Sequence, residues 1–188
     1  MSHGWGKDYN HAERVLWQNA EQILSEIGLQ PGATLADIGC GDGFFSLPAA
    51  KMVGDTGLIY ALDASPEAIS SLKEKVAAAG LKNIRTFIAD AERTVVCDRC
   101  ADVVLMANVL HDFEHPLLVL ANAIKILKPG GILADLDWRK EAQQIHGPPL
   151  AKRLSQDDAS AILKEAGFIV VKSSLSGPFH YLLLAKAI

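Results

Sequence analysis

The stretch Leu35-Ala36-Asp37-Ile38-Gly39-Cys40-Gly41-Asp42-Gly43-Phe44-Phe45 decides the fold class. It is a short apolar run that ends in three closely spaced glycines, and the residues after it have the character of a helix. Glycines at such a turn between strand and helix let a nucleotide-containing cofactor approach the backbone closely. The stretch therefore predicts a sheet edge that binds such a cofactor.

Strands and helices alternate along the rest of the chain. We expect strands at 34–38, 58–62, 84–89, 101–107, 132–136, 168–173 and 181–187, and helices at 11–27, 44–52, 66–80, 117–127 and 159–166. This alternation implies a parallel sheet that helices cover on both faces. The last two strands are only about seven residues apart, too few for a parallel crossover, so they should form an antiparallel hairpin. We therefore predict an α/β fold, a doubly wound, seven-stranded, mostly parallel sheet with a C-terminal antiparallel hairpin strand, built as one domain from residues 1–188.

Local patterns add detail to three of the helices. Ser65 followed by Pro66 is the order expected for an N-cap and a first helical position. Ser155 and Asp158 have the spacing of an acidic capping box. The apolar face of the first helix should pack inward, and it consists of Val15, Leu16, Ala20, Ile23, Leu24 and Ile27.

Composition argues against several classes of protein. The net charge is −4 and there is no long basic run, so a nucleic-acid partner receives no electrostatic support. The N-terminus does not have the basic and apolar segments of a signal peptide, and the longest apolar run, near 101–110, is about half a membrane span. Three cysteines argue against a disulfide framework and suit a reducing cytoplasm. We expect a cytoplasmic protein that does not insert into membranes.

The glycine spacing separates two classes of cofactor. A dinucleotide site has G-x-G-x-x-G, whose third glycine allows close packing of helix on strand. Here the glycines are Gly39, Gly41 and Gly43, and Phe44 stands where the third dinucleotide glycine would be. Asp37 precedes the first glycine by two residues, where dinucleotide sites usually keep an apolar residue. An acid at this place suits a ligand that carries a cationic group.

The pattern D-x-G-x-G-x-G closely resembles motif I of the class I S-adenosylmethionine-dependent methyltransferases. The resemblance extends over most of the chain, because Leu127-Lys128-Pro129-Gly130-Gly131 is similar to the family's turn before its fifth strand and the closing antiparallel strand is typical of the family. The resemblance implies a Rossmann-like methyltransferase fold, S-adenosylmethionine as cofactor and S-adenosylhomocysteine as product.

The resemblance also implies which residues hold the cofactor. Asp63 ends the second strand, where the family's acid binds the ribose hydroxyls, and Asp90 matches the acid near the adenine amino group. Taken alone, both could be ordinary turn residues after strands. The expected cofactor residues are Asp37, Gly39, Cys40, Gly41, Gly43, Asp63, Ala64, Asp90, Ala91 and Asn108.

The loop after the fourth strand, Ala107–Phe113, resembles the corresponding loop of the ubiquinone- and menaquinone-type small-molecule methyltransferases, which often place a histidine there. We predict that His111 acts as general base or orients the acceptor, since a free histidine titrates near neutrality. The alternative is a histidine that only caps and packs the following helix.

The long connection 138–154 is the expected acceptor-binding loop, because loops longer than about 12 residues in a compact domain are often functional. Arg139 and Lys140 could hold an anionic acceptor or be solvated surface cations, and a lone His180 could be structural. In similar methyltransferases the N-terminal region covers the cofactor, so 1–30 could form a lid as well as a packed helix. The candidate substrate residues are Tyr9, His111, Trp138, Arg139, His146 and His180.

The Cys97-x-x-Cys100 pair raises zinc or redox chemistry. A closed zinc site needs four ligands and there is no second pair, so we expect no metal site. The pair also precedes the fourth strand, at the sheet edge opposite the cofactor. We interpret these cysteines as incidental, and three thiols that do not meet at the acceptor edge make an arsenic substrate a weak candidate.

The leading functional prediction is methyl transfer to a small molecule. Asn108-Val109-Leu110-His111 differs from the Asn/Asp-Pro-Pro-aromatic tetrapeptide of DNA amino-methylating enzymes, which disfavours a nucleic-acid substrate. Two alternatives remain. One is a non-catalytic S-adenosylmethionine-binding sensor or partner module. The other is an NAD-linked oxidoreductase, although no Tyr-x-x-x-Lys pair supports it. The sequence indicates neither the acceptor, nor the methylated atom, nor the oligomeric state.

Overall fold

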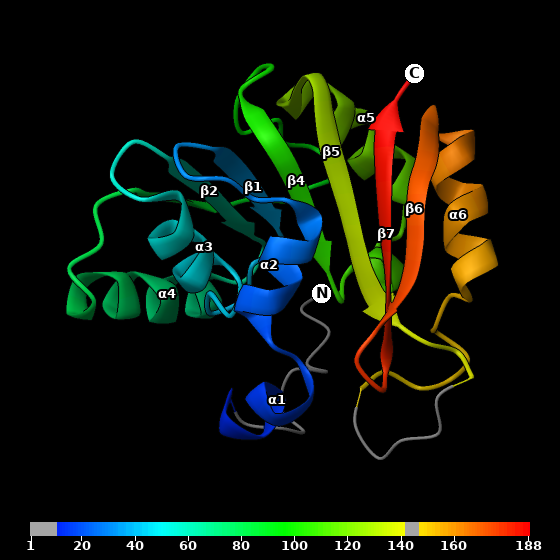
Figure 1. The fold of residues 1–188 in the computed structure, drawn as a ribbon, viewed down its shortest axis with the longest axis horizontal. Helices are drawn as coiled ribbons and strands as arrows, with labels where there is room; N and C mark the ends of the chain where they lie inside the picture. The colour runs from blue at the N-terminus through cyan, green and yellow to red at the C-terminus, as the bar shows by residue number, and fades with distance from the viewer. Residues whose placement is uncertain (1–10, 142–146) are drawn as a thin grey trace.

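The computed structural model describes residues 11–141 and 147–188, and its centre is a seven-stranded sheet (Figure 1). The strands are β1 Thr34–Ile38, β2 Leu58–Asp63, β3 Ile84–Ile88, β4 Ala101–Ala107, β5 Leu127–Trp138, β6 Phe168–Ser176 and β7 His180–Ala187. Their spatial order is β3-β2-β1-β4-β5-β7-β6.

Strand direction confirms the predicted fold. The strands from β3 through β5 pair in parallel, whereas β7 runs antiparallel to both β5 and β6. Only residues 177–179 join β6 to β7, so the hairpin turn is shorter than the sequence suggests. Because β5 is parallel to β4, the β6–β7 turn lies at the same sheet edge as the ends of β4 and β5 (Figure 1).

Helices cover both faces of the sheet. They are α1 His11–Trp17, α2 Ala20–Ile27, α3 Ser46–Val53, α4 Pro66–Ala78, α5 Pro116–Ile126, α6 Gln156–Glu165 and the short 3-10 helix η2 Leu110–Asp112. Apolar side chains of α2, α3 and α4 form one core layer with the sheet, and those of α5 and α6 form the other. This two-sided covering explains why the central strands are almost continuously apolar.

The N-terminal segment differs from the prediction. The single helix expected over 11–27 is wrong, because the chain breaks into α1 and α2 and Asn19 caps α2 by accepting a hydrogen bond from the backbone of Gln22. The predicted inward face is wrong at its start. Val15 and Leu16 are 52% and 85% exposed, while Ile23, Leu24 and Ile27 are buried as expected.

The N-caps predicted for α4 and α6 are confirmed. The Ser65 hydroxyl accepts a hydrogen bond from the backbone of Ala68, and Pro66 follows at the first helical position. Ser155 and Asp158 form a reciprocal capping box at α6. The helix expected at 44–52 begins two residues later, because Phe44 and Phe45 belong to the turn and are buried there.

Helix α5 passes directly into β5, which begins at Leu127 and not at 132. The backbone N–H groups of Arg99 and Cys100 donate to the carbonyls of Lys125 and Ile126 at 2.8 and 2.9 Å, so the segment before β4 caps the end of α5. The interpretation of the cysteines as incidental is wrong, because Cys97 and Cys100 are disulfide-bonded in this segment. A single disulfide between neighbouring residues is still compatible with the expectation that the chain has no framework of several disulfides.

One further property concerns membranes. Within residues 11–141 and 147–188, no helix has both the length and the apolar character needed to cross a bilayer.

Candidate active site

The candidate site lies at the edge where β1, β2, β4 and β5 end. Its first part is the glycine turn, residues 39–43, whose N–H groups at Gly39 and Cys40 both donate to the carbonyl of Leu62 on β2. Gly39, Gly41 and Gly43 have φ angles of 71°, 55° and 93°, a region that side chains disfavour. The sequence signal therefore reflects a real backbone requirement.

The three glycines differ in what surrounds them. A Cβ on Gly39 would lie 2.5 Å from Val109 Cγ1, and one on Gly43 would lie 2.4 Å from Leu72 Cδ1. A Cβ on Gly41 would meet no atom within 4 Å. Packing therefore accounts for Gly39 and Gly43, while Gly41 leaves open space beside the turn.

Asp63 joins the end of β2 to the glycine turn. One of its carboxylate oxygens accepts a hydrogen bond from the N–H of Gly41, and the other accepts one from the N–H of Ser65, both at 2.8 Å. Ala64 beside it is exposed. Asp90, at the end of the neighbouring β3, is also exposed, and Ala91 is buried. The structure thus brings both predicted acids to adjacent strand ends.

Two predicted cofactor residues are buried, Asp37 just before the turn and Cys40 within it. Asp37 is 1% exposed and accepts a 2.6 Å hydrogen bond from the Ser46 hydroxyl. Burial raises the pKa of Asp37 to about 6, against the opposing effects of Ser46 and Arg14. Burial also raises the pKa of the Cys40 thiol, with help from the negative charges of Asp37 and Asp63. The thiol is therefore neutral and not nucleophilic.

Asn108 stands at the end of β4. Its φ of 60° is unusual for a residue other than glycine, and its N–H donates to the carbonyl of Leu136 at 2.7 Å. Both polar atoms of its side-chain amide are buried without a hydrogen-bond partner among the described residues. Buried amides are normally hydrogen-bonded, so a ligand at this edge is a natural partner.

His111 and Asp137 form a buried ion pair. The His111 side chain is 2% exposed, and Nδ1 lies 2.8 Å from an oxygen of Asp137, while Nε2 lies 3.5 Å from Asp112. Burial alone would lower its pKa, but the hydrogen bond and charge of Asp137 outweigh this and raise the pKa of the imidazole above its usual value. The two neighbouring carboxylates therefore favour the protonated imidazole.

Asp137 is a residue that the sequence analysis did not single out. Besides His111 Nδ1 it accepts hydrogen bonds from the backbone N–H groups of His111 and Trp138. Two residues earlier, Asp135 is fully buried and its carboxyl oxygens have no partner among residues 11–141 and 147–188. Burial and then the charge of Asp137 raise the pKa of Asp135 well above its usual range. An acid at the end of β5 is the signal that could have indicated Asp137.

Four rings meet on the other side of β5, and we call Trp17, Trp138, Phe179 and His180 the aromatic cluster. Trp138 and His180 are register partners across β5 and β7 with ring centroids 4.2 Å apart. Trp17 stacks on His180 at 5.4 Å with an interplanar angle of 13°, and its ring lies 5.9 Å from that of Phe179. Neither Trp17 nor Phe179 was predicted, because they come from α1 and from the hairpin turn.

The expected acceptor loop contributes a buried guanidinium. Arg153 is 4% exposed and donates to the carbonyls of Pro148 and Arg139, and its guanidinium carbon lies 5.7 Å from the Trp138 ring centroid. The backbone N–H of Arg139 donates to the carbonyl of Phe179 at 2.8 Å, which ties the loop to the β6–β7 turn. Lys140 is exposed and lies 3.7 Å from Asp158, as a surface cation would.

Two of the predicted substrate residues, Tyr9 and His146, lie outside the described residues. Across the two described ranges, no group of three or more histidine, cysteine, aspartate or glutamate side chains is arranged to hold a metal ion.

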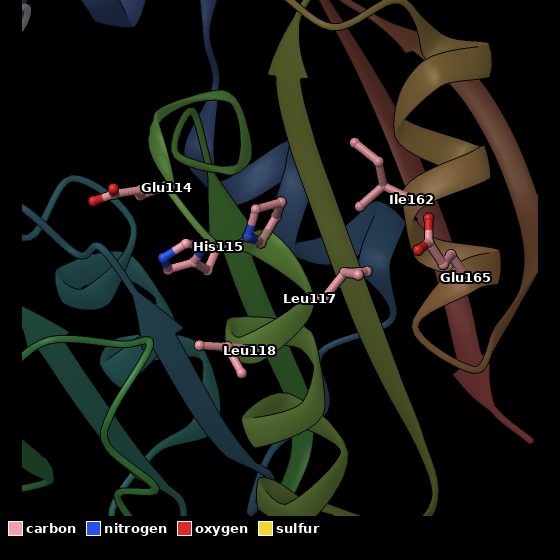
Figure 2. A pocket seen from close by; sticks show the side chains of 7 residues that line it. Glu114, His115, Leu117, Leu118, Ile162 and Glu165 are labelled. Atoms are coloured by element: carbon pink, nitrogen blue, oxygen red, sulfur yellow. The ribbon is translucent and has the colours of Figure 1, made fainter.

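A separate apolar groove of about 560 Å³ lies between the start of α5 and α6 (Figure 2). Leu117 on α5 and Ile162 on α6 line it, with Glu114 and Glu165 also among its lining residues. None of the predicted site residues lines this groove. It is therefore distinct from the sheet edge.

Comparison with known proteins agrees with this geometry. A family model described as a methyltransferase domain matches residues 29–171. The crystal structure of a SAM dependent methyltransferase from Aquifex aeolicus is 30% identical, has a TM-score of 0.88 and is covered over its whole length, against 96% of this chain.

Two curated relatives carry more specific names. An arsenite methyltransferase of Halobacterium salinarum is 30% identical over 153 residues, which is 77% of this chain and 39% of that protein. A demethylmenaquinone methyltransferase of Staphylococcus aureus is 27% identical over 125 residues, 66% of this chain and 50% of that protein. The chain therefore spans half or less of the length of these relatives.

Proposed function

Because the chain belongs to the methyltransferase domain family, we propose that it transfers a methyl group from S-adenosylmethionine to a small-molecule acceptor. The observation that carries this proposal is the glycine turn tied to Asp63, with open space beside Gly41. An acid at the end of the second strand of such a sheet stands where a ribose is bound.

The residues at the edge fit an S-adenosyl ligand. Each oxygen of Asp63 accepts one backbone hydrogen bond and retains a lone pair for a ribose hydroxyl. The unpartnered amide of Asn108 has a donor and an acceptor to offer. We assign Asp90 to the adenine side, because its strand lies next to that of Asp63. When bound, S-adenosylmethionine supplies an electrophilic methyl group on a sulfonium.

For His111 the geometry favours an orienting role. Both ring nitrogens lie near carboxylates, and the imidazole holds its proton more tightly than a free histidine does. A protonated imidazole cannot accept a second proton, but its positive charge favours an acceptor oxygen that becomes negative. We therefore propose that His111 fixes the loop after β4 and orients the acceptor there.

The positions of the described thiols favour an organic acceptor over arsenite, which is the substrate named for one relative. Cys40 is buried within the glycine turn, and Cys97 and Cys100 are bonded to each other before β4, at the opposite edge. The demethylmenaquinone relative is named for an organic substrate, which supports the same choice.

Calorimetric titration with S-adenosylhomocysteine and with NAD tests the cofactor. We expect S-adenosylhomocysteine to bind and NAD not to bind. Asp63→Ala should weaken S-adenosylhomocysteine binding about 100-fold, because two hydrogen bonds to a charged group are lost. Asp55→Ala, which changes an exposed acid remote from the glycine turn, is the matched control and should leave the affinity unchanged. Absence of S-adenosylhomocysteine binding would refute the proposal.

A second assay tests transfer itself. If S-adenosylmethionine binds but a broad panel of small molecules releases no S-adenosylhomocysteine, the non-catalytic sensor becomes the better explanation. Release with one acceptor only would identify the substrate.

A further inference from the structure

We propose that the apolar groove between the start of α5 and α6 is a second ligand site, and that it takes a small amphipathic organic cation (Figure 2). Such a ligand has an apolar body that carries an ammonium group. Since the groove is separate from the sheet edge, the inference does not rest on methyl transfer. Three properties of the groove support it: its apolar walls, its unpaired carboxylates and its size.

Helix α5 has more apolar surface than the sheet covers. Its buried side chains pack on the sheet, and they are Val119, Leu120, Asn122, Ala123 and Ile126. Leu117 and Leu118 lie outside this face and are 39% and 51% exposed. Single exposed leucines are common on flat surfaces, but these two line a concavity together with Pro116 and, from α6, Ile162. The walls of the groove therefore suit an apolar body.

The two carboxylates of the groove come from different elements. Glu114 precedes α5, whereas Glu165 is the last residue of α6 (Figure 2). Both residues are exposed, and neither carboxylate has a hydrogen-bond or ion-pair partner among residues 11–141 and 147–188. Two acids without partners beside an apolar surface favour a ligand of opposite charge.

Cations of the chain do not neutralise this charge. Within the described part of the chain, no lysine or arginine lines the groove. Lys152 lies closer to the sheet edge, and its Nζ is 3.2 Å from an oxygen of Asp112. Lys164 is exposed beside Glu165 in the sequence but is not a lining residue. The groove thus presents negative charge that a ligand ammonium can complement.

The size and charge of the groove favour a small molecule over a second copy of the chain. Its volume of about 560 Å³ lies within the range of small-molecule pockets, about 300–1,000 Å³. A twofold contact centred on the groove would bring Glu114 and Glu165 of both copies together. Like charges that face each other across an interface are unfavourable, and each copy already has a net charge of −4.

Titration of the ¹⁵N-labelled full chain with three matched probes tests the ligand class. The probes are 4-phenylbutylammonium, 4-phenylbutanol and 4-phenylbutanoate. We expect the ammonium to bind roughly fivefold more tightly than the alcohol, and the carboxylate to bind weakest. Equal affinity for the ammonium and the alcohol, or no binding of the ammonium, would overturn the proposal.

The same spectra locate the site. The largest amide shifts should occur at Leu117, Leu118 and Ile162, and the ammonium should still bind in saturating S-adenosylhomocysteine. Shifts centred on the glycine turn, or displacement of the ammonium by S-adenosylhomocysteine, would assign the probe to the sheet edge and overturn a second site.

A charge variant tests the carboxylates. Glu165→Gln keeps the shape of the side chain and removes its charge, so the affinity for the ammonium should fall roughly threefold while that for the alcohol stays unchanged. Glu74→Gln changes an exposed acid of α4, on the other face of the sheet, and is the matched control. If Glu165→Gln and Glu74→Gln bind the ammonium equally, the charge argument is wrong.

An apolar variant tests the walls. Leu117→Asn should weaken binding of all three probes roughly fivefold, because part of the apolar contact is lost. Leu16→Asn, which changes an exposed leucine of α1, should leave the affinities unchanged. Wild-type binding by Leu117→Asn would place the probes elsewhere.

Sedimentation of the wild-type chain and of Leu117→Asn examines the competing occupant. We expect both to have the same mass in solution. A wild-type dimer that Leu117→Asn dissociates would assign the groove to a second copy of the chain and overturn the ligand site.

Discussion

The site edge has two halves, one around the glycine turn and one around the ends of β4 and β5, and they differ in how far their buried polar groups are hydrogen-bonded. Around the glycine turn, the carboxylates of Asp37 and Asp63 accept hydrogen bonds from Ser46, Gly41 and Ser65. Around the ends of β4 and β5 and the start of β7, polar side-chain atoms are buried with no partner among the described residues, and they belong to Asn108, Asp135, His180 and Tyr181. The first half is complete in itself, whereas the second has unmet hydrogen-bonding capacity.

We propose that this difference divides binding and selectivity between the two halves. A half whose backbone and acids are already fixed can hold one invariant ligand with little reorganisation. A half with unpaired buried groups pays for them in stability and regains that free energy only when a matching ligand binds. We therefore expect substitutions in the glycine turn to act mainly through strain, and substitutions in the second half to act mainly through charge and hydrogen bonding.

The largest expected effect is at the contact between the halves. Gly39→Ala should lower the free energy of unfolding by about 3 kcal/mol, because its positive φ strains a side chain and its Cβ would overlap Val109 on the loop after β4. Urea unfolding measures the change. Gly41→Ala, with positive φ but open space, should cost only about 1 kcal/mol.

A second substitution separates strain from overlap at this contact. Val109→Ala in the Gly39→Ala background should recover most of the difference between the two glycine variants. If it recovers nothing, Val109 does not join the halves in the way the structure implies.

Two aspartates on one strand sharpen the comparison. Asp137→Asn should lower the free energy of unfolding by about 2 kcal/mol, because an amide cannot replace a carboxylate that accepts from His111 and from two backbone N–H groups. Asp135→Asn should instead raise it by about 1 kcal/mol at pH 8, since a buried unpartnered acid is costly.

The pH dependence of the Asp135→Asn variant tests why it is more stable than the wild-type protein. Because its pKa is raised, the Asp135 carboxyl keeps its proton to a higher pH in the folded chain than in the unfolded chain, so the wild-type protein loses stability as pH rises above 3.8 toward the folded pKa. The gain from Asp135→Asn should therefore shrink at pH 4. An equal gain in stability at pH 4 and pH 8 would mean that the carboxyl of Asp135 does not have a raised pKa in the folded chain.

Near neutral pH the smallest expected effect concerns the two buried histidines, whose pKa values shift in opposite directions. His180, with its pKa lowered from 6.5 to about 3, contributes stability that is complete above pH 6.5 and is lost as pH falls toward 3, by at most about 1.4 kcal/mol per pH unit. His111, with a raised pKa, contributes stability below pH 6.5 that is lost as pH rises through its folded pKa.

Nuclear magnetic resonance of the ring protons measures both titrations directly. We expect His180 to remain neutral throughout mild acid and His111 to titrate at a higher pH than a free histidine. His180→Phe should flatten the acid side of the stability profile and leave the alkaline side unchanged. A His180 that titrates near 6.5 would show that its ring is accessible to water.

The first half of the edge could be predicted from the sequence because its determinants are local. Glycines with positive φ, an acid at the end of a strand and a serine before Pro66 each act over a few residues, so the pattern and the structure coincide. The hairpin was equally predictable, because the number of residues between β6 and β7 excludes a crossover.

The second half could not be predicted because its contacts join distant segments. Trp17, Trp138 and His180 come from three elements, and no spacing in the chain links them. The break between α1 and α2 had a readable signal in Asn19, a good N-cap, but the apolar period across 11–27 is equally consistent with one helix. The disulfide between Cys97 and Cys100, three residues apart, was not predicted, because an odd number of cysteines argued against a disulfide framework.

The β6–β7 turn sets the register in which β7 pairs with its neighbours. Alternate residues of β7 face opposite sides of the sheet, so Trp138 opposes His180 while Asp137 opposes Tyr181. Inserting a single residue into the three-residue turn would shift this register and exchange the two faces. Tyr181 would then enter the cluster of rings, and His180 would move among the buried aspartates. The length of one short turn therefore determines whether His180 or Tyr181 packs among the rings.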